Sequence, residues 1–216
     1  HGRFLEGPDY DESSFARDVC KMHDAIYYET VPTAQQFVDT ISKIIYYMDE
    51  PTAGPGVFPQ YCVSHQASKH VKVVLGGQGG DEIFGGYARY VVAYLEQAIK
   101  GAITGSNEEG RHIVNLASIS PNLSILYQYT PMLKNFWSEG LFQEMDQRYF
   151  RLVDKSPNIS KILAFDLFDV QSQKEIFGNF QAVFNKPNTS SYINKMTHFD
   201  TNTLLPALLQ VEDRVS

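Results

Sequence analysis

The sequence predicts an α/β protein in which a partial parallel sheet is followed by an all-helical subdomain. Up to about residue 90, short β-branched runs alternate with amphipathic helical segments, which is typical of a parallel sheet with right-handed crossovers. From residue 91 to 216 the apolar residues keep helical spacing, and no segment has the alternation of a strand. We therefore expect two parts, residues 1–90 and 91–216.

The first part is expected to contain three strands joined by amphipathic helices. The strands are predicted at 2–5, 25–31 and 71–75, and the longer helices at about 13–22, 33–48 and 59–70. Acidic and hydroxyl residues at 11–13 precede the first helix, as at many helix N-termini. The second helix is expected to stop at Asp49, because Pro51 disfavours helical backbone in the residue before it.

The second part is predicted to be helical throughout. Two segments rich in Leu, Ile and Phe, 116–133 and 163–184, are expected to form its core faces. A last helix is predicted to be capped at 199–201, with Pro206 in its first turn, where proline is tolerated. Since the sequence begins inside a predicted strand and ends inside a predicted helix, we interpret it as a piece of a longer chain.

The composition favours a folded protein in a reducing, cytoplasmic setting. The net charge is −7 and no Lys/Arg cluster is present, so nucleic acid is not an expected partner. No apolar run is long enough to span a membrane. Cys20 and Cys62 lack the spacing of a zinc site, and two cysteines are too few for a disulfide framework.

A glycine-rich segment directly after the third predicted strand is the clearest candidate ligand site. Residues 76–87 read Gly-Gly-Gln-Gly-Gly-Asp-Glu-Ile-Phe-Gly-Gly-Tyr and hold six of the fifteen glycines. Glycines let a backbone approach a ligand closely, and the N–H groups of a following helix attract anions. The segment has no P-loop lysine, and Glu82 occupies the third glycine position of a dinucleotide fingerprint. It therefore predicts an anion-binding turn of another type.

Two plainer interpretations of this segment remain open. The glycines could serve only a tight turn that requires them sterically. Asp81 and Glu82 could cap the following helix and complement its dipole. Alternatively, one of the two carboxylates could hold Mg²⁺ beside a phosphate.

Segment 76–87 is similar to the Ser-Gly-Glu-Gly-x-Asp-Glu-x-Phe-Gly-Gly-Tyr signature of the synthetase domain of glutamine-dependent asparagine synthetases. Three other stretches add to this resemblance, in the same order as in the family. Residues 2–12 resemble its second strand and following helix, and Met48-Asp-Glu-Pro51 matches a recurrent helix end. Residues 199–216 resemble the segment that leads into its Asp-Arg-x-Ser-Met-Ala helix.

The resemblance implies an ATP-pyrophosphatase domain of the adenine nucleotide alpha hydrolase-like type. It implies ATP and Mg²⁺ as cofactors, and aspartate that is activated as β-aspartyl-AMP and then attacked by ammonia. That ammonia would be released from glutamine in a separate N-terminal domain. By position, Gly76 and Gly77 are expected to lie against ATP, Gly2 near the adenine, and Asp81 at Mg²⁺ and pyrophosphate.

This sequence departs from the family pattern at one expected catalytic position. Gln78 stands where the family has a glutamate that supports adenylate formation. An amide can orient a reacting group but cannot act as a base near neutral pH. Two alternatives to asparagine synthesis therefore stay open: an amidotransferase or cyclase that acts on another carboxylate, and a nucleotide-binding homologue without catalysis.

The second departure is that the family's central strand and its pyrophosphate loop, which would precede His1, are absent from the sequence. We therefore expect the isolated chain to be inactive. Unpaired strand edges are costly, so we expect another way of closing the sheet. The strand at 2–5 could pair with the strand at 71–75, or two copies of the chain could form a homodimer.

Overall fold

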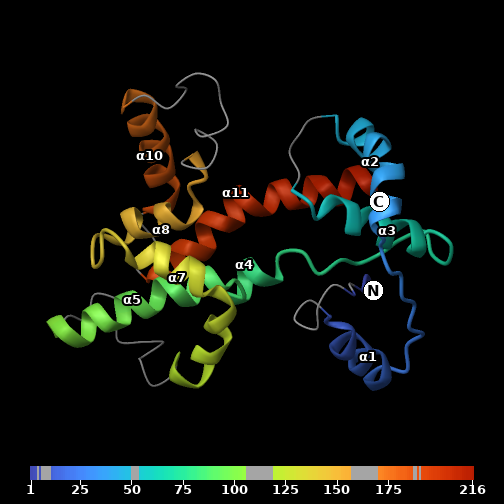
Figure 1. Ribbon diagram of the computed structural model, residues 1–216, viewed down its shortest axis with the longest axis horizontal. Coiled ribbons are helices and arrows are strands. Elements are labelled where there is room, and N and C mark those ends of the chain that lie inside the picture. Colours follow the sequence, from blue (N-terminus) through green and yellow to red (C-terminus); the bar gives the residue numbers. More distant parts are fainter. Residues whose placement is uncertain are drawn as a thin grey trace. The chain divides into compact units, whose positions relative to one another are not determined.

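The described part of the chain is mostly helical (Figure 1). The computed structural model describes residues 1–3, 5, 11–49, 54–105, 119–156, 170–186, 189 and 191–216. The chain divides into two compact units, of which the first comprises His1–Gln78 with Leu205–Ser216 and the second comprises Gly79–Leu204. The predicted division of the family domain into residues 1–90 and 91–216 is a different division, and it stays a prediction.

The first unit contains the helices α1 (Ser13–Met22), α2 (Ala34–Met48) and α3 (Val57–Ala67). The second unit contains α4 (Gly80–Phe84), α5 (Ala88–Thr104), the 3-10 helix η2 (Ser120–Tyr129), α7 (Thr130–Trp137), α8 (Met145–Val153) and α10 (Val170–Phe184). A long last helix, α11 (Tyr192–Val215), supplies residues to both units. No helix in the described part of the chain is long and apolar enough to cross a membrane.

The core of the first unit forms where α2, α3 and the end of α11 meet. Its buried residues are Ile44, Met48, Val57, Phe58, Val211 and Val215. Helix α2 begins and ends close to the predicted positions. A capping box fixes its start: the Gln36 N–H donates to Thr33 Oγ1 at 3.2 Å, and the Thr33 N–H donates to Gln36 Oε1 at 3.0 Å.

We expect Thr33→Ala to lower the free energy of unfolding by about 1 kcal/mol, because it removes one half of this capping box. Urea denaturation followed by circular dichroism measures the change. Gln36→Glu is the matched control, since a carboxylate keeps the acceptor and suits the helix N-terminus. Equal losses in both variants would show that the box does not stabilise α2.

The predicted parallel sheet is not confirmed. Among the described residues, β pairing is confined to one isolated parallel bridge between Gly2 and Thr30. It consists of Arg3 N–H to Thr30 O and Thr30 N–H to His1 O, both at 2.9 Å. The predicted strands at 2–5 and 25–31 therefore meet at one point only, and Phe4 lies outside the described residues.

The predicted strand at 71–75 is likewise not confirmed. The segment is irregular, and Leu75 is 95% exposed. Its pairing with residues 2–5, one of the two expected ways to close the sheet, is not seen among the described residues, where the bridge joins Gly2 to Thr30. β-Branched residues favour a strand, but a strand is stable only when a second backbone satisfies its N–H and C=O groups.

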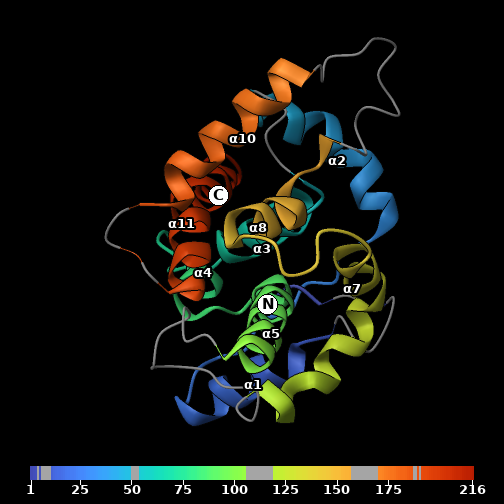
Figure 2. The same cartoon turned by 90° about the vertical axis from the view of Figure 1, so that its left-hand side faces the viewer.

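The second unit confirms the predicted helical character for those of its residues that are described. Helix α8 packs against α5, α7 and α10, an arrangement visible in two views (Figures 1 and 2). The predicted core faces 116–133 and 163–184 are described only from 119 and 170 onward. Their described parts supply Ile119, Leu126, Phe180 and Phe184 to the buried core.

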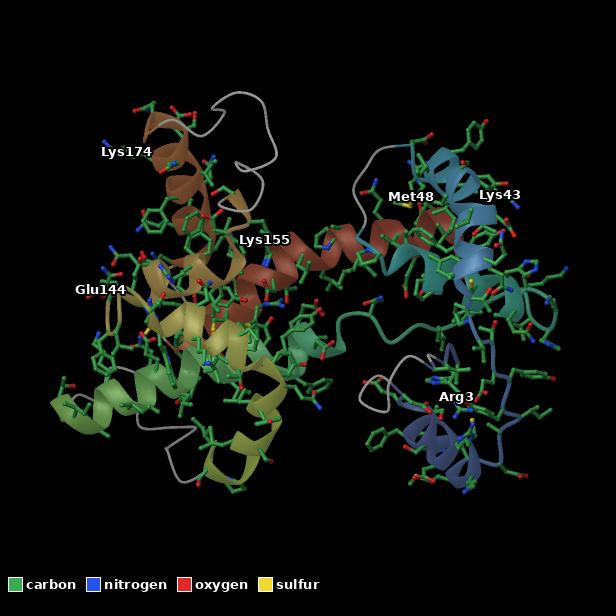
Figure 3. All side chains as sticks on the ribbon, viewed as in Figure 1. Arg3, Lys43, Met48, Glu144, Lys155 and Lys174 are labelled. Atoms are coloured by element: carbon green, nitrogen blue, oxygen red, sulfur yellow. The ribbon has the colours of Figure 1, made fainter. Side chains whose placement is uncertain are left out.

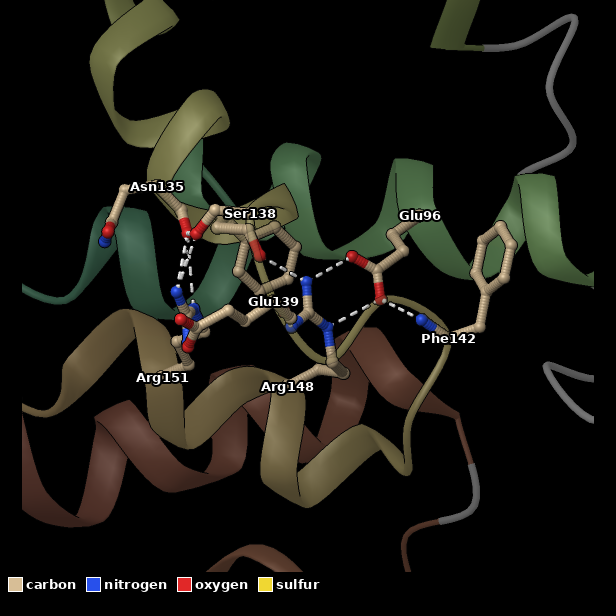
Figure 4. A network of polar contacts seen from close by, with 8 residues as sticks. Glu96, Asn135, Ser138, Glu139, Phe142, Arg148 and Arg151 are labelled. Carbon is tan, nitrogen blue, oxygen red and sulfur yellow. Dashed lines mark hydrogen bonds and ion pairs between the residues drawn. The ribbon is translucent and has the colours of Figure 1, made fainter.

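A buried ion pair joins α5 to α8 inside this unit (Figure 4). The Arg148 Nε and Nη2 atoms each donate to Glu96 at 2.6 Å, and both side chains are 1% exposed. Arg148 also donates to the carbonyl oxygens of Phe136 and Glu139 at 2.6 Å. The Phe142 N–H donates to Glu96 Oε1 at 3.1 Å. Each charge is thus paired and further hydrogen-bonded, as burial demands.

The last helix starts earlier than predicted. Helix α11 begins at Tyr192, so Pro206 lies inside the helix and not in its first turn. Tyr192 and Met196 are fully buried, and their packing stabilises helical backbone in the residues that precede 199. Asp200 is therefore an interior helical residue and not a cap.

Candidate functional site

The glycine-rich segment forms the predicted turn and helix start. Helix α4 is one short turn, and left-handed glycines flank it: Gly79 has φ +93° and Gly85 has φ +70°. Side chains other than glycine adopt this backbone region only with strain. These two glycines thus set where α4 begins and ends. The plain steric interpretation therefore accounts for Gly79 and Gly85.

The two acids of α4 have different surroundings. Glu82 is 1% exposed and accepts a hydrogen bond from the Tyr87 hydroxyl at 2.7 Å. Burial and this bond to Glu82 raise the pKa of Tyr87, which stays protonated. Asp81 is exposed, and its side chain lies so close to Gly86 that a Cβ there would collide with it. Of the two acids, only Asp81 is thus open to a ligand, and its metal role stays a prediction.

The described residues contain no group of three His, Cys, Asp or Glu side chains that could hold a metal ion. A Mg²⁺ ion held by Asp81, as the sequence predicts, would therefore need water and phosphate oxygens to complete its coordination. This is a usual arrangement, because Mg²⁺ keeps several waters and binds through one or two carboxylates plus substrate phosphates.

The other predicted site residues lie in the first unit. A Cβ at Gly76 would come within 2.8 Å of the Glu212 carboxylate, so the absence of a side chain allows this close approach. Gly77 has open space around its Cα, and Gln78 is exposed. Gly2 pairs with Thr30, and a Cβ there would lie 3.1 Å from Val63. Gly76, Gly77 and Gln78 are thus exposed, although the Glu212 carboxylate lies against Gly76, whereas Gly2 is half-buried beside Val63.

A buried polar cluster in the second unit was not predicted from the sequence. Asp200 Oδ2 accepts hydrogen bonds from Arg89 Nη2 at 2.6 Å, Tyr90 Oη at 2.5 Å and Tyr149 Oη at 2.6 Å. Arg89 Nε lies 3.2 Å from the same oxygen and also donates to Tyr149 at 3.1 Å. The one available signal is that Arg89 and Tyr90 lie just after the glycine-rich segment, separated from it only by Ala88.

The surroundings of this cluster keep its two tyrosine hydroxyls and its guanidinium protonated, so that all three remain donors. Burial, together with the Asp200 carboxylate, raises the pKa of Tyr90 and Tyr149. Burial lowers the pKa of Arg89, but Tyr149 and Asp200 outweigh it, so the net shift is upward. The guanidinium also lies over the Tyr87 ring, 3.8 Å from its centroid.

A cavity of about 550 Å³ adjoins this cluster. Its lining comes from helices α5, η2, α7, α8 and α11 and from the residues next to them: Tyr87, Ala88, Arg89, Tyr129, Met132, Leu152, Val153, Lys155, Phe199, Asp200, Thr203 and Leu204. All these residues belong to the second unit.

The chain matches the asparagine synthase family over residues 3–216 and belongs to this family. The resemblance read from the sequence motifs is thereby confirmed. Membership is consistent with an adenine nucleotide alpha hydrolase-like fold, although the described residues form no sheet.

Three relatives illustrate the similarity. A Mycobacterium bovis protein named as a candidate glutamine-hydrolysing asparagine synthetase is 50% identical over 60 residues, or 28% of this chain and 9% of the relative. Glutamine-hydrolysing asparagine synthetase 1 of Bacillus subtilis is 42% identical over 60 residues, covering 28% and 10% of the two chains. The Saccharomyces cerevisiae enzyme of the same name is 33% identical over 89 residues, covering 40% and 16%. The chain thus matches only a small part of each relative's length. No solved structure matches it.

Proposed function

We propose that this chain is part of an enzyme that makes asparagine from aspartate, with ATP and ammonia from glutamine. The match to the asparagine synthase family over residues 3–216 carries this proposal. The proposed route activates the side-chain carboxylate of aspartate as β-aspartyl-AMP with release of pyrophosphate, after which ammonia displaces AMP. The enzyme is proposed to act in the cytoplasm, and a homodimer remains a way to complete the sheet.

The proposed roles of the site residues follow from the resemblance. Gly76 and Gly77 offer backbone donors to ATP, Gly2 lies near the adenine, and Asp81 holds Mg²⁺. Two observations support part of this assignment: the open space at Gly77 and the exposed carboxylate of Asp81. A bound Mg²⁺ would neutralise charge that develops on the leaving pyrophosphate.

Gln78 is the residue that favours a second candidate function. Its side chain is exposed and neutral, so it can orient a substrate but cannot remove a proton from ammonia. An amidotransferase or cyclase that acts on another carboxylate is therefore the alternative enzyme. The non-enzymatic alternative is a homologue that binds nucleotide without catalysis.

We expect Asp81→Asn to slow asparagine formation by the complete protein roughly 100-fold, because charge stabilisation of the leaving pyrophosphate is weakened. The assay supplies aspartate, glutamine, ATP and Mg²⁺, and measures asparagine and pyrophosphate separately. Asp18→Asn is the control, since this carboxylate is exposed on α1. If the Asp81→Asn variant formed asparagine at the same rate as the unaltered protein, the metal role would be contradicted.

The same assay separates the three functions. Absence of asparagine from the unaltered complete protein would refute asparagine synthesis. Pyrophosphate release that requires a different carboxylate would support the amidotransferase or cyclase, and a Gln78→Glu variant with no gain in asparagine would agree with it. ATP binding without pyrophosphate release would support the homologue without catalysis.

A further inference from the structure

We propose that the cavity beside Arg89 and Asp200 binds a small organic carboxylate that has an apolar body. The site lies within the second unit and does not depend on the proposed asparagine synthesis. Three features of the lining carry the inference: a fixed guanidinium, an excess of positive charge, and apolar walls.

Arg89 is held in one orientation before any ligand binds. Its Nε and Nη2 atoms bond to Asp200 and Tyr149, and the Tyr87 ring lies beneath the guanidinium. Within the part of the chain that the structure describes, its Nη1 atom has no hydrogen-bond partner, and 21% of the side chain is exposed. The Nε and Nη2 atoms of this guanidinium are already hydrogen-bonded, and Nη1 is a donor without a partner among the described residues, which suits it to a carboxylate oxygen. Ligand binding would then cost little side-chain entropy, because the arginine is already ordered.

The described residues that line the cavity carry a net positive charge. They include two cations, Arg89 and Lys155, and one carboxylate, Asp200, so their net charge is +1. Lys155 is exposed and forms no ion pair with any other described residue (Figure 3). Its flexible ammonium group can approach a bound anion from the solvent side, whereas Arg89 contacts it from within.

The remaining lining indicates the body of the ligand. Tyr129 and Met132 line the cavity from η2 and α7, Leu152 and Val153 from α8, and Phe199 from α11. Binding to such a surface is favourable when it buries the carbon atoms of a ligand, and it offers little to a fully hydrated anion. A volume of about 550 Å³ is far larger than a carboxylate group alone requires. The ligand class is therefore a carboxylate with an aromatic or branched group, and not inorganic phosphate.

Calorimetric titration of the full chain with 3-phenylpropanoate and with 3-phenylpropanamide tests the proposal. The two probes have the same apolar body, but only the first is charged. We expect the carboxylate to bind about tenfold more tightly, which is about 1.4 kcal/mol, since a hydrogen bond to a charged group is stronger than one to a neutral group. Inorganic phosphate is titrated as a third probe and is expected to bind more weakly than the carboxylate.

Two pairs of variants locate the binding. Thr203 is exposed and lines the cavity, so Thr203→Trp is expected to fill it and abolish binding, whereas Thr201→Trp on the same helix is expected to bind normally. Lys155→Gln is expected to weaken carboxylate binding about two- to fivefold, as for an exposed ion pair. Lys174→Gln, an exposed site on α10 that does not line the cavity, is its control (Figure 3).

Circular dichroism establishes that each variant is folded. Equal affinity for the carboxylate and the amide would overturn the proposal, and so would binding that survives Thr203→Trp. Failure of the folded chain to bind either probe would also overturn it. Tighter binding of phosphate would show a site for inorganic anions instead. None of these measurements uses ATP or asparagine. A failure of this proposal can therefore be distinguished from a failure of the proposed enzyme activity.

Discussion

We expect Arg148→Ala to lower the free energy of unfolding by about 3–5 kcal/mol, because it leaves the Glu96 carboxylate buried without its partner. Glu96 is 1% exposed and cannot recover its hydration unless the packing of α5 against α8 opens. Two carbonyl groups that Arg148 bonds, those of Phe136 and Glu139, lose a donor at the same time. Urea denaturation followed by circular dichroism measures the loss.

Arg151→Ala is the matched control for this variant. Arg151 lies one turn further along α8 and pairs with Glu139 at 3.0 Å, but the Glu139 side chain is 78% exposed (Figure 4). Removal of such a surface pair is expected to cost about 1 kcal/mol or less. If both arginine variants lost the same stability, the buried pair would have no special role.

The second large effect is expected for Asp200→Ala, which should also cost about 3–5 kcal/mol. The substitution leaves Arg89 without its counter-charge and removes the acceptor shared by the Tyr90 and Tyr149 hydroxyls. Asp213→Ala is the control, since Asp213 is exposed on the same helix. The same denaturation measurement applies.

A double variant shows whether the loss arises from the ion pair. Removal of Arg89 together with Asp200 is expected to recover part of the stability, because no unpaired buried charge then remains. Strictly additive losses would contradict a direct coupling between Arg89 and Asp200.

Local sequence patterns were sufficient to predict the helices of the first unit. The spacing of Phe37, Ile44 and Met48 predicted a helix over 33–48, and α2 covers Ala34–Met48. Helical signals of this kind are local, since each turn satisfies its own backbone groups. The sheet depends instead on a partner strand distant in sequence, and the run at 71–75 has none among the described residues.

The candidate site could be predicted only where the signal was local. The glycines around α4 and the exposed Asp81 follow from a short motif. Asp200 was misassigned as a cap, because an aspartate before an apolar helical run has the same appearance whether it caps the helix or is buried in its interior. Nothing near Glu96 in the sequence indicates that its partner is Arg148, 52 residues later.

The Arg89–Asp200 pair also has a consequence for the time course of folding. It joins residues 111 apart in the chain, so a large loop must close before the pair forms, and such contacts slow folding. We expect the pair to be absent from the transition state, in which case its loss accelerates unfolding far more than it slows folding. Asp200 would then govern how long the helical unit persists once folded, and not how quickly it forms.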